Sequence, residues 1–335
     1  MQIFPVFLPH AGCPHRCLFC DQHGTGGAEH FPDPERISVW LDQRLPTCGD
    51  GEIAFYGGSF SALPESVQTA FLKVGRHFLA QGRIGGIRVS TRPDALGIDQ
   101  AAHLVENGVS TAEIGCQSFD EAVLTASRRG HTGDDIRKAV AVCRSLGLNY
   151  GLQLMPGLPG GGRQEALASL RQALALNPAF LRIYPTLVCR GTGLATLWQA
   201  GQFEPLELDE AVDIVAEQWL ICRQARVQVI RMGLQDSAQL RWALLAGPYH
   251  PAFGQLVKSR LWRWALARAV GQDQAVRVHP HDLADALGQG RENISWLRQT
   301  RGLTGINGDQ RVKRGCFEVD GLCHGLFLPM ERSLT

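Results

Sequence analysis

The chain has no long apolar run, no charged-then-apolar leader and no excess of charge of one sign. Of its 335 residues, 44% are hydrophobic and 19% are charged, and the formal net charge is +1. A membrane-spanning helix needs about 20 consecutive apolar residues, so we expect none. Without a secretory leader we expect a cytoplasmic protein. A nearly neutral chain gives no global argument for binding nucleic acid.

The chain has only ten cysteines in 335 residues, which is too few for a disulfide scaffold. Most are scattered in apolar stretches, where a free cysteine behaves as a small hydrophobe. Three of them, Cys13, Cys17 and Cys20, instead form a C-x3-C-x2-C motif, and the next cysteine is Cys48. An ordinary [4Fe–4S] cluster takes four cysteines. Three would leave one iron open, which is typical of catalytic rather than structural metal sites.

Zinc is the alternative ligand for this motif. Structural zinc favours C-x2-4-C pairs with a second Cys or His pair further along. The chain shows no such partner pair at finger spacing after Cys20, so the motif favours an iron–sulfur cluster.

Short apolar runs alternate with helical segments six times in about the first 190 residues. The predicted strands cover residues 3–8, 52–56, 86–91, 111–116, 149–155 and 180–187. The predicted helices between and after them cover residues 34–45, 64–79, 99–107, 120–127, 132–146 and 163–176. This alternation predicts βαβ units around a parallel sheet. The expected fold class is α/β, a partial (β/α)6 TIM-like barrel.

After residue 205 the pattern changes to longer helices and then to short mixed elements. Helices are expected at residues 207–224 and within 248–269, and a strand at residues 227–232. Strands at 276–278 and 311–319 and helices at 280–287 and 293–301 complete the expectation. We therefore predict a main domain over residues 1–235 and a helical, then small α+β, C-terminal appendage over residues 236–335.

Two conspicuous motifs follow the first two strands. The cysteine loop comes after residues 3–8, and Gly57-Gly58-Ser59 comes after residues 52–56. In barrels built from parallel strands, active sites gather at the carboxyl ends of the strands. Both motifs are therefore expected at one mouth of the barrel.

This pairing resembles the radical S-adenosylmethionine (SAM) superfamily, in its Elp3/coproporphyrinogen-dehydrogenase-like, B12-independent branch. The resemblance covers about residues 1–235, and Phe19 before the last cysteine fits it. Further phrases that carry it are Ser90-Thr91-Arg92-Pro93-Asp94, Gly115-Cys116-Gln117-Ser118-Phe119, Arg128-Arg129-Gly130-His131-Thr132 and Met155-Pro156-Gly157-Leu158-Pro159-Gly160. The resemblance implies that Cys13, Cys17 and Cys20 bind a [4Fe–4S] cluster whose fourth iron is chelated by SAM. A one-electron reductant such as flavodoxin or ferredoxin would trigger cleavage of SAM to a 5′-deoxyadenosyl radical that abstracts hydrogen from substrate.

The resemblance also implies a set of SAM contacts: Gly57, Gly58, Ser59, Ser90, Gln117, Arg129 and Gln153. Glycines let the backbone approach the SAM ammonium group closely, although a plain strand-to-helix turn explains them equally simply. Gln117 would bond the ribose, and Arg129 would pair with the SAM carboxylate unless it only caps a helix end. Gln153 replaces an acid found in coproporphyrinogen dehydrogenases. Tyr184 and Cys189 could donate a hydrogen atom, bind substrate or pack in the core.

The substrate does not follow from these motifs. The chain shows no acetyl-CoA loop like that expected in Elp3, and residues 21–24 lack the extra cysteine expected in coproporphyrinogen dehydrogenases. A basic cluster with an aromatic residue makes RNA a candidate partner; it comprises Arg291, Trp296, Arg298, Arg301, Arg311, Lys313 and Arg314. The competing hypothesis is a non-catalytic iron–sulfur sensor or cofactor-delivery protein derived from the same fold.

Overall fold

The structure is a computed structural model that describes residues 2–8, 12–13, 17–20 and 32–327. The chain divides into two compact units. One contains residues 1–206 and 234–248, and the other contains residues 207–233 and 249–335. Each is described below by itself. The domain boundary at residue 235 stays a prediction.

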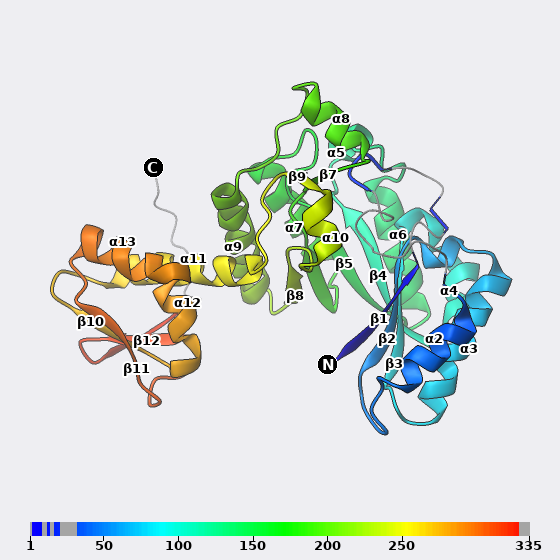
Figure 1. The fold of residues 1–335 in the computed structure, drawn as a ribbon, viewed down its shortest axis with the longest axis horizontal. Helices are drawn as coiled ribbons and strands as arrows, with labels where there is room; N and C mark the ends of the chain where they lie inside the picture. Colours follow the sequence, from blue (N-terminus) through cyan, green and yellow to red (C-terminus); the bar gives the residue numbers. More distant parts are fainter. Residues whose placement is uncertain (1, 9–11, 14–16, 21–31, 328–335) are drawn as a thin grey trace. The chain divides into compact units, whose positions relative to one another are not determined.

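A curled parallel sheet is the centre of the fold, as predicted (Figure 1). Its strand order is β1-β2-β3-β4-β5-β6-β8, and each neighbouring pair from β1 to β6 is parallel. The bounds are β1 Ile3–Leu8, β2 Glu52–Gly57, β3 Gly86–Thr91, β4 Val109–Gln117, β5 Asn149–Leu154, β6 Phe180–Ile183 and β8 Gln228–Met232. This arrangement is the predicted partial TIM-like barrel.

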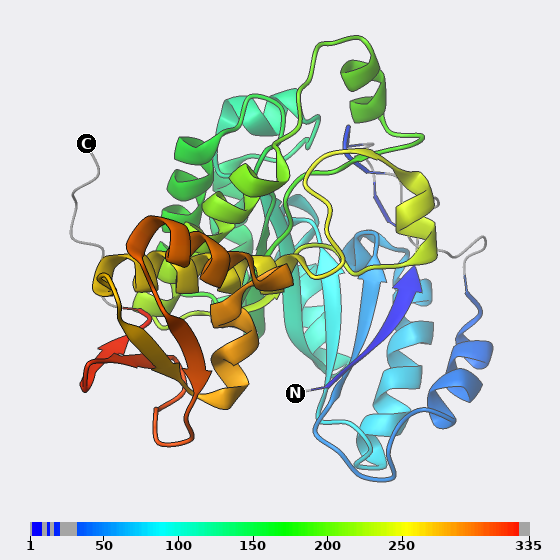
Figure 2. The ribbon, with the colours of Figure 1, turned by 60° about the vertical axis from the view of Figure 1, so that its left-hand side comes forward.

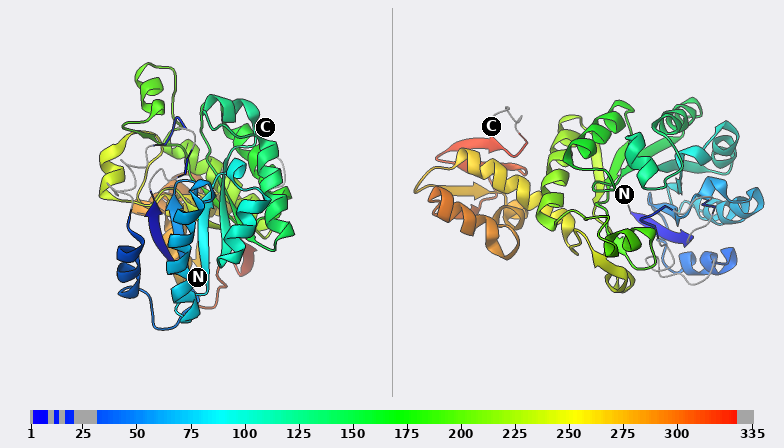
Figure 3. Two further views of the ribbon diagram at one scale, coloured as in Figure 1. Left: turned by 90° about the vertical axis from the view of Figure 1, so that its right-hand side faces the viewer. Right: turned by 90° about the horizontal axis from the view of Figure 1, so that it is seen from above.

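Helices follow the strands of the first unit and lie outside the arc of strands, as the view from above shows (Figure 3, right). They are α2 Pro34–Asp42, α3 Glu65–Ala80, α4 Ile98–Glu106, α5 Glu121–Ala126, α6 Gly133–Ser145 and α7 Arg163–Ala175. The unit also contains α8 Gly193–Gln199 and α10 Ala238–Ala243. Local signals fix several starts. Asp33 caps α2 by accepting from the N–H of Glu35, and Thr132 and Asp135 form a capping box on α6. Short strands β7 Val188–Cys189 and β9 Leu244–Ala246 pair with each other.

The two faces of the sheet differ in chemistry. Alternate residues such as Ile53, Ile87 and Ile114 are fully buried among apolar neighbours and form the core with the helices. The residues between them, including Glu52 and Arg88, are buried and charged. Because side chains alternate along a strand, the polar residues share the inner face of the barrel. Polar chemistry is thus concentrated inside the barrel and at its mouth.

The second unit contains a separate four-stranded sheet with the order β11-β10-β12-β13, coloured orange to red in Figure 2. Its elements are α9 Leu208–Gln224, α11 Phe253–Ala269, β10 Ala275–Val278, α12 Leu283–Leu287, α13 Glu292–Arg301, β11 Gly305–Gly308, β12 Cys316–Val319 and β13 Leu322–Gly325. The predicted α+β appendage is confirmed, but the predicted strand at residues 311–319 is wrong in its first half. Asp309 accepts from the N–H of Arg311 and closes a turn there, so β12 begins only at Cys316.

No helix within the described residues is both long and apolar enough to cross a membrane.

Candidate functional site

Two glycines place the cysteine loop against the end of β2. Gly12 has φ +70°, and a Cβ added there would lie 2.3 Å from the carbonyl oxygen of Ser59. Gly57 has φ +120°, and a Cβ there would lie 2.5 Å from the carbonyl oxygen of Leu8. Both positions need a residue without a side chain. The N–H of Gly58 also donates to the Leu8 carbonyl at 3.1 Å. The first two strands therefore bring the cysteines and the glycine pair together, as predicted.

Leu18 anchors the cysteine loop between Cys17 and Cys20. Its N–H donates to the carbonyl of Ser127 at 3.1 Å, and its own carbonyl accepts from Leu194 at 2.7 Å. Its side chain is buried with Val188 and Leu194. These contacts hold the loop between the end of α5 and the start of α8.

Two arginines surround the sulfur of Cys17, which is buried. Nη1 of Arg129 donates to Sγ at 3.3 Å, and Nη1 of Arg92 lies at 3.9 Å. Arg92 is held by two bonds to Asp94, at 2.9 and 2.8 Å. Cysteine binds a metal as its anionic thiolate, and these two guanidinium groups lie where they would face such an anion. Burial raises the pKa of Cys13, although Arg129 and Arg92 act in the opposite direction.

A missing side chain at Gly115 makes room for two predicted SAM contacts. A Cβ on Gly115 would lie 2.8 Å from Nε2 of Gln117 and 2.9 Å from Nη2 of Arg129. Nη2 of Arg129 donates to the Gly115 carbonyl at 2.6 Å, while its Nε is buried with no hydrogen-bond partner among the described residues. Nε2 of Gln153 donates to Oε1 of Gln117 at 3.0 Å. Gln117, Arg129 and Gln153 thus come together at the ends of β4 and β5.

Ser59 and Ser90 are placed differently from each other. Ser59 is fully buried, and its hydroxyl is used by Thr91 Oγ1 at 3.1 Å and by the N–H of Arg92 at 3.2 Å. Any contact of Ser59 with SAM would therefore involve its main chain. Ser90 is half-buried and lies opposite Glu113 in the register of β3 and β4, on the inner face.

His131 is a site residue that sequence reasoning did not select. Its Nε2 lies 3.1 Å from the carbonyl oxygen of Cys116, and the ring is buried. Burial, together with the charges of Arg129 and Arg92, lowers the pKa of His131 to about 3. The imidazole is therefore neutral near pH 7. His131 belongs to the segment Arg128–Thr132 that supported the family resemblance. Its role could not be predicted from that segment, because it depends on contacts with distant residues.

Below the mouth, the inner face carries an ion network that was also missed. Arg88 bonds Glu52 at 2.6 Å and Glu113 at 2.7 Å, and Arg182 pairs with Glu113 at 2.9 Å. Burial lowers the pKa of Arg88, but the hydrogen bond and charge of Glu113 and the charge of Glu52 outweigh burial and raise it. The two cations and two carboxylates balance, which is the condition for burying charge in a protein interior.

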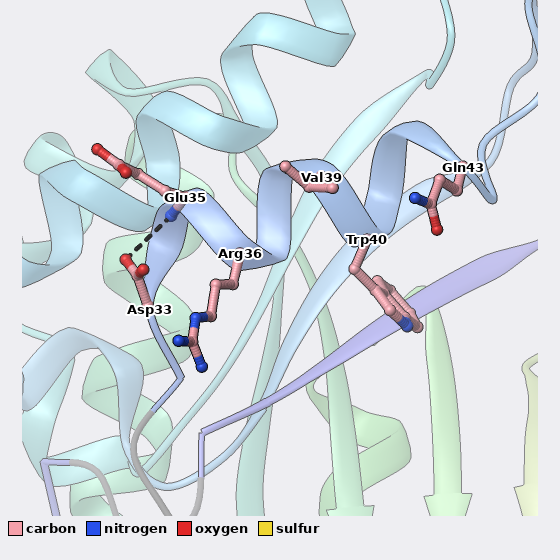
Figure 4. Close-up of a pocket in the computed structure, with 6 residues that line it drawn as sticks. All are labelled: Asp33, Glu35, Arg36, Val39, Trp40 and Gln43. Atoms are coloured by element: carbon pink, nitrogen blue, oxygen red, sulfur yellow. Dashed lines mark hydrogen bonds between the residues drawn. The ribbon is translucent and has the colours of Figure 1, made fainter.

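A hollow on the surface of α2 lies apart from this mouth. It is lined by Asp33, Glu35, Arg36, Val39, Trp40 and Gln43, none of them a predicted site residue (Figure 4).

Among the described residues, no three His, Cys, Asp or Glu side chains converge as they would on a single metal ion. Ligands of a cubane cluster bind different irons and need no such convergence.

Two of the six basic residues in the cluster expected in the second unit are ion-paired, and a third bonds a carbonyl. Arg311 bonds Asp309 at 2.7 Å, Arg314 lies 3.7 Å from Asp282, and Arg298 donates to the carbonyl of Thr304 at 3.2 Å. Trp296 is exposed on α13. A neutralised cation attracts phosphate less strongly, so Arg311 and Arg314 contribute less to this surface than the sequence suggests.

Comparison with known families agrees with this geometry. Residues 7–173 match the Radical SAM superfamily, and residues 178–263 match the Radical_SAM C-terminal domain. The chain belongs to the radical SAM superfamily. It is an enzyme of that superfamily, whose cofactors are a [4Fe–4S] cluster and SAM.

Its curated relatives include Elp3-like proteins. The chain is 25% identical over 244 residues to the tRNA uridine(34) acetyltransferase of Dehalococcoides mccartyi, a match that covers 61% of this chain and 53% of the relative. It is 32% identical over 187 residues to Elongator complex protein 3 of Saccharomyces cerevisiae, covering 49% and 33%. The chain thus spans about half the length, or less, of these relatives.

Solved structures show the same fold. The archaeal Elp3 of Methanocaldococcus infernus aligns with a TM-score of 0.64 at 22% identity, covering 79% of this chain and 63% of that one. The hydrogenase maturase HydG aligns with a TM-score of 0.57 at 13% identity, covering 93% and 60%.

The residues at the mouth fit the two cofactors of the superfamily. Three cysteines offer sulfur atoms of the type that holds an iron–sulfur cluster, and Arg92 and Arg129 place positive charge beside one of them. The unpartnered Nε of Arg129 and the space over Gly115 leave a donor and room for a bound anionic group.

Proposed function

We propose that Cys13, Cys17 and Cys20 hold a [4Fe–4S] cluster at the mouth of the barrel and that SAM binds beside it. When bound, these groups supply a 5′-deoxyadenosyl radical that abstracts hydrogen from a substrate. The observation that carries the proposal is the approach of two guanidinium groups to the Cys17 sulfur, at 3.3 and 3.9 Å. Cations near an anionic cluster stabilise it and tune its potential.

The other residues have roles in binding SAM. The main chain of Gly57 and Gly58 admits its ammonium group, because no side chain blocks the approach. Arg129 receives the SAM carboxylate as a charge-assisted hydrogen-bond donor. Gln117 and Gln153, already bonded to each other at 3.0 Å, offer their remaining amide groups to the ribose. Ser90 contributes a hydroxyl on the inner face. A flavodoxin or a ferredoxin is the proposed source of electrons.

Anaerobic reconstitution tests the cofactor assignment. We expect about four irons and four sulfides per chain and formation of 5′-deoxyadenosine with SAM and dithionite. Cys17→Ala should lose both, whereas Cys48→Ala, at an exposed position outside the motif, should keep both. Equal iron content in the two variants would contradict the proposal.

We further propose RNA as the substrate class. The support is that relatives of this chain are tRNA uridine(34) acetyltransferases, which match it over only part of their length. Filter binding with total tRNA at low and moderate salt is the test, since phosphate contacts make binding salt-dependent. The triple variant Arg291→Gln, Arg298→Gln, Arg301→Gln should lower the salt dependence. Absence of salt-sensitive binding in the parent chain would refute the RNA assignment and leave the SAM chemistry standing.

A further inference from the structure

Trp242, on the last turn of α10, is the most exposed of the large apolar side chains that the structure describes, at 69%. Tryptophan is ordinarily a highly buried residue. Its helix neighbours Leu240 and Ala243 are buried, so α10 itself is packed and the indole projects from it. Exposed tryptophans are typical of binding surfaces, because one ring supplies a large contact area with a polar edge.

Arg190, which directly follows β7, holds the last turn of α10 in place. Its N–H donates to the carbonyl of Ala243 at 2.7 Å, and its Nε donates to the carbonyl of Trp242 at 3.2 Å. Its guanidinium carbon lies 5.9 Å from the centroid of the Trp242 ring, within the range of cation–π attraction. The indole and the guanidinium therefore have defined positions relative to each other.

The charge of Arg190 is not offset by a neighbouring side chain. Among the residues that the structure describes, no carboxylate pairs with Arg190, whereas the nearby Arg241 is paired with Asp236 at 2.9 Å. Arg190 is also exposed. A guanidinium binds phosphate through two parallel donors. The tip of α10 thus presents an aromatic ring and an unneutralised cation side by side.

This surface is connected to the loop that carries the cysteines. β9 directly follows α10 and pairs with β7. Leu18 of the cysteine loop is buried in one cluster with Val188 of β7, and Leu245 of β9 packs against that cluster. Packed apolar side chains therefore join the tip of α10 to the segment between Cys17 and Cys20. A molecule bound at Trp242 would lie at the rim of the barrel mouth, on the side of the proposed cluster.

We propose that Trp242 and Arg190 bind an unpaired base of an RNA together with its phosphate, the base stacking on the indole and the phosphate facing the guanidinium. The inference rests on the RNA substrate proposed above and adds a place where that RNA is held. Bases in single-stranded loops can turn outward and stack on aromatic side chains, whereas bases inside a duplex cannot. The surface therefore suits a loop. Stacking of this kind tolerates any base, because every base has a π-face.

Filter binding of the reconstituted full chain to an RNA hairpin with a single-stranded loop tests the contact. Trp242→Leu should weaken binding about 5- to 150-fold, the loss expected when one stacking side chain is removed. Trp242→Phe should keep most of the affinity, because it keeps an aromatic face. Arg190→Gln should reduce the salt dependence by about one phosphate contact. Trp40→Leu is the matched control, because Trp40 is also exposed and lies 4.6 Å from an arginine, Arg44, but on α2; it should bind RNA as the parent chain does.

Abasic RNA tests the stacking without altering the protein. Loop bases are removed one at a time, so that every phosphate stays. At one position the parent chain should lose affinity, and Trp242→Leu should lose nothing further with that RNA. Full affinity of the parent chain for every abasic RNA, or parent-like RNA binding by Trp242→Leu, overturns the assignment and leaves the proposed function intact.

Two further outcomes separate this contact from its alternatives. Parent-like RNA binding by Trp242→Leu combined with slower electron transfer from flavodoxin would overturn the RNA assignment of the surface in favour of a protein partner. A parent chain that binds no RNA in a salt-sensitive manner would refute both the RNA substrate and this contact, while formation of 5′-deoxyadenosine would still support the SAM chemistry.

Discussion

Arg129 places its Nη1 atom 3.3 Å from the sulfur of Cys17, a residue 112 positions earlier in the chain. The contact joins the segment after α5 to the loop after β1. The same segment supplies the Ser127 carbonyl that accepts from Leu18. The cysteine motif is therefore held by the main chain and a side chain of one distant segment. The same segment carries Arg129, which we propose binds the carboxylate of SAM.

Replacing Arg129 should weaken SAM binding more than it weakens the fold. A hydrogen bond to a charged group is worth about 1.5–3 kcal/mol, so Arg129→Gln should reduce affinity for SAM by about 10- to 100-fold. Equilibrium binding to the reconstituted protein measures the effect. Arg128→Gln is the control, because Arg128 is the exposed neighbour. Equal losses in the two variants would contradict the role assigned to Arg129.

A methyl group at Gly115 should damage the site and spare the fold. The two atoms closest to the added Cβ would be the ends of the Gln117 and Arg129 side chains, at 2.8 and 2.9 Å, and these can move, whereas the Thr91 carbonyl oxygen at 3.6 Å is at an ordinary contact distance. Gly115→Ala should therefore lower SAM affinity with little change in melting temperature. Gly162→Ala, where nothing lies within 4 Å of the new Cβ, should change neither. A large fall in melting temperature without a fall in SAM affinity would show that the space at Gly115 serves packing rather than SAM binding.

The ion network below the site should contribute to stability. Glu113→Gln leaves Arg88 and Arg182 without their shared carboxylate, and breaking a buried ion pair costs about 3–5 kcal/mol. Urea unfolding of the apoprotein measures this loss. The exposed pair of Asp134 and Lys138 provides the comparison, since Asp134→Asn should not change stability measurably. A similarly small effect of Glu113→Gln would show that the network is dispensable for folding.

His131 should make stability depend on pH. Its pKa is about 3 in the folded chain, below the ordinary value of 6.5. Between these pH values the unfolded chain binds a proton that the folded chain does not. The contribution of His131 to the free energy of unfolding is therefore fully present above about pH 6.5 and is lost as the pH falls toward 3. The slope from this one group approaches about 1.4 kcal/mol per pH unit. Unfolding curves of apoprotein should show a shallower pH dependence in His131→Gln. Identical slopes would mean that the ring is not buried neutral.

The strands and their polar ends could be predicted from the sequence because both are local signals. The apolar run at residues 149–155 corresponds to β5, and the cysteine loop and Gly57 meet as the parallel sheet requires. The approach of Arg92 to Cys17 could not be predicted, because it depends on where two side chains end after the chain folds. The inner ion network was missed for the same reason.

Short elements of the second unit were harder to predict. Residues 311–319 alternate polar and apolar side chains in part, and Val312 is buried as a strand residue would be. The carboxylate of Asp309, however, captures the N–H of Arg311 and turns the chain. A side-chain hydrogen bond of this kind competes with strand pairing, and periodicity does not register it.

The buried charged residues on the inner face allow the substrate range of the barrel to change without loss of stability. Glu52 and Arg88 use their charges on each other, at 2.6 Å, and lie nearer the amino ends of their strands than Ser90 and Gln153 do. This buried ion pair and the proposed SAM contacts thus lie at different heights inside the barrel. Substitutions in the upper rows can alter what the barrel accepts while the lower rows keep it closed, so new activities need not compromise folding.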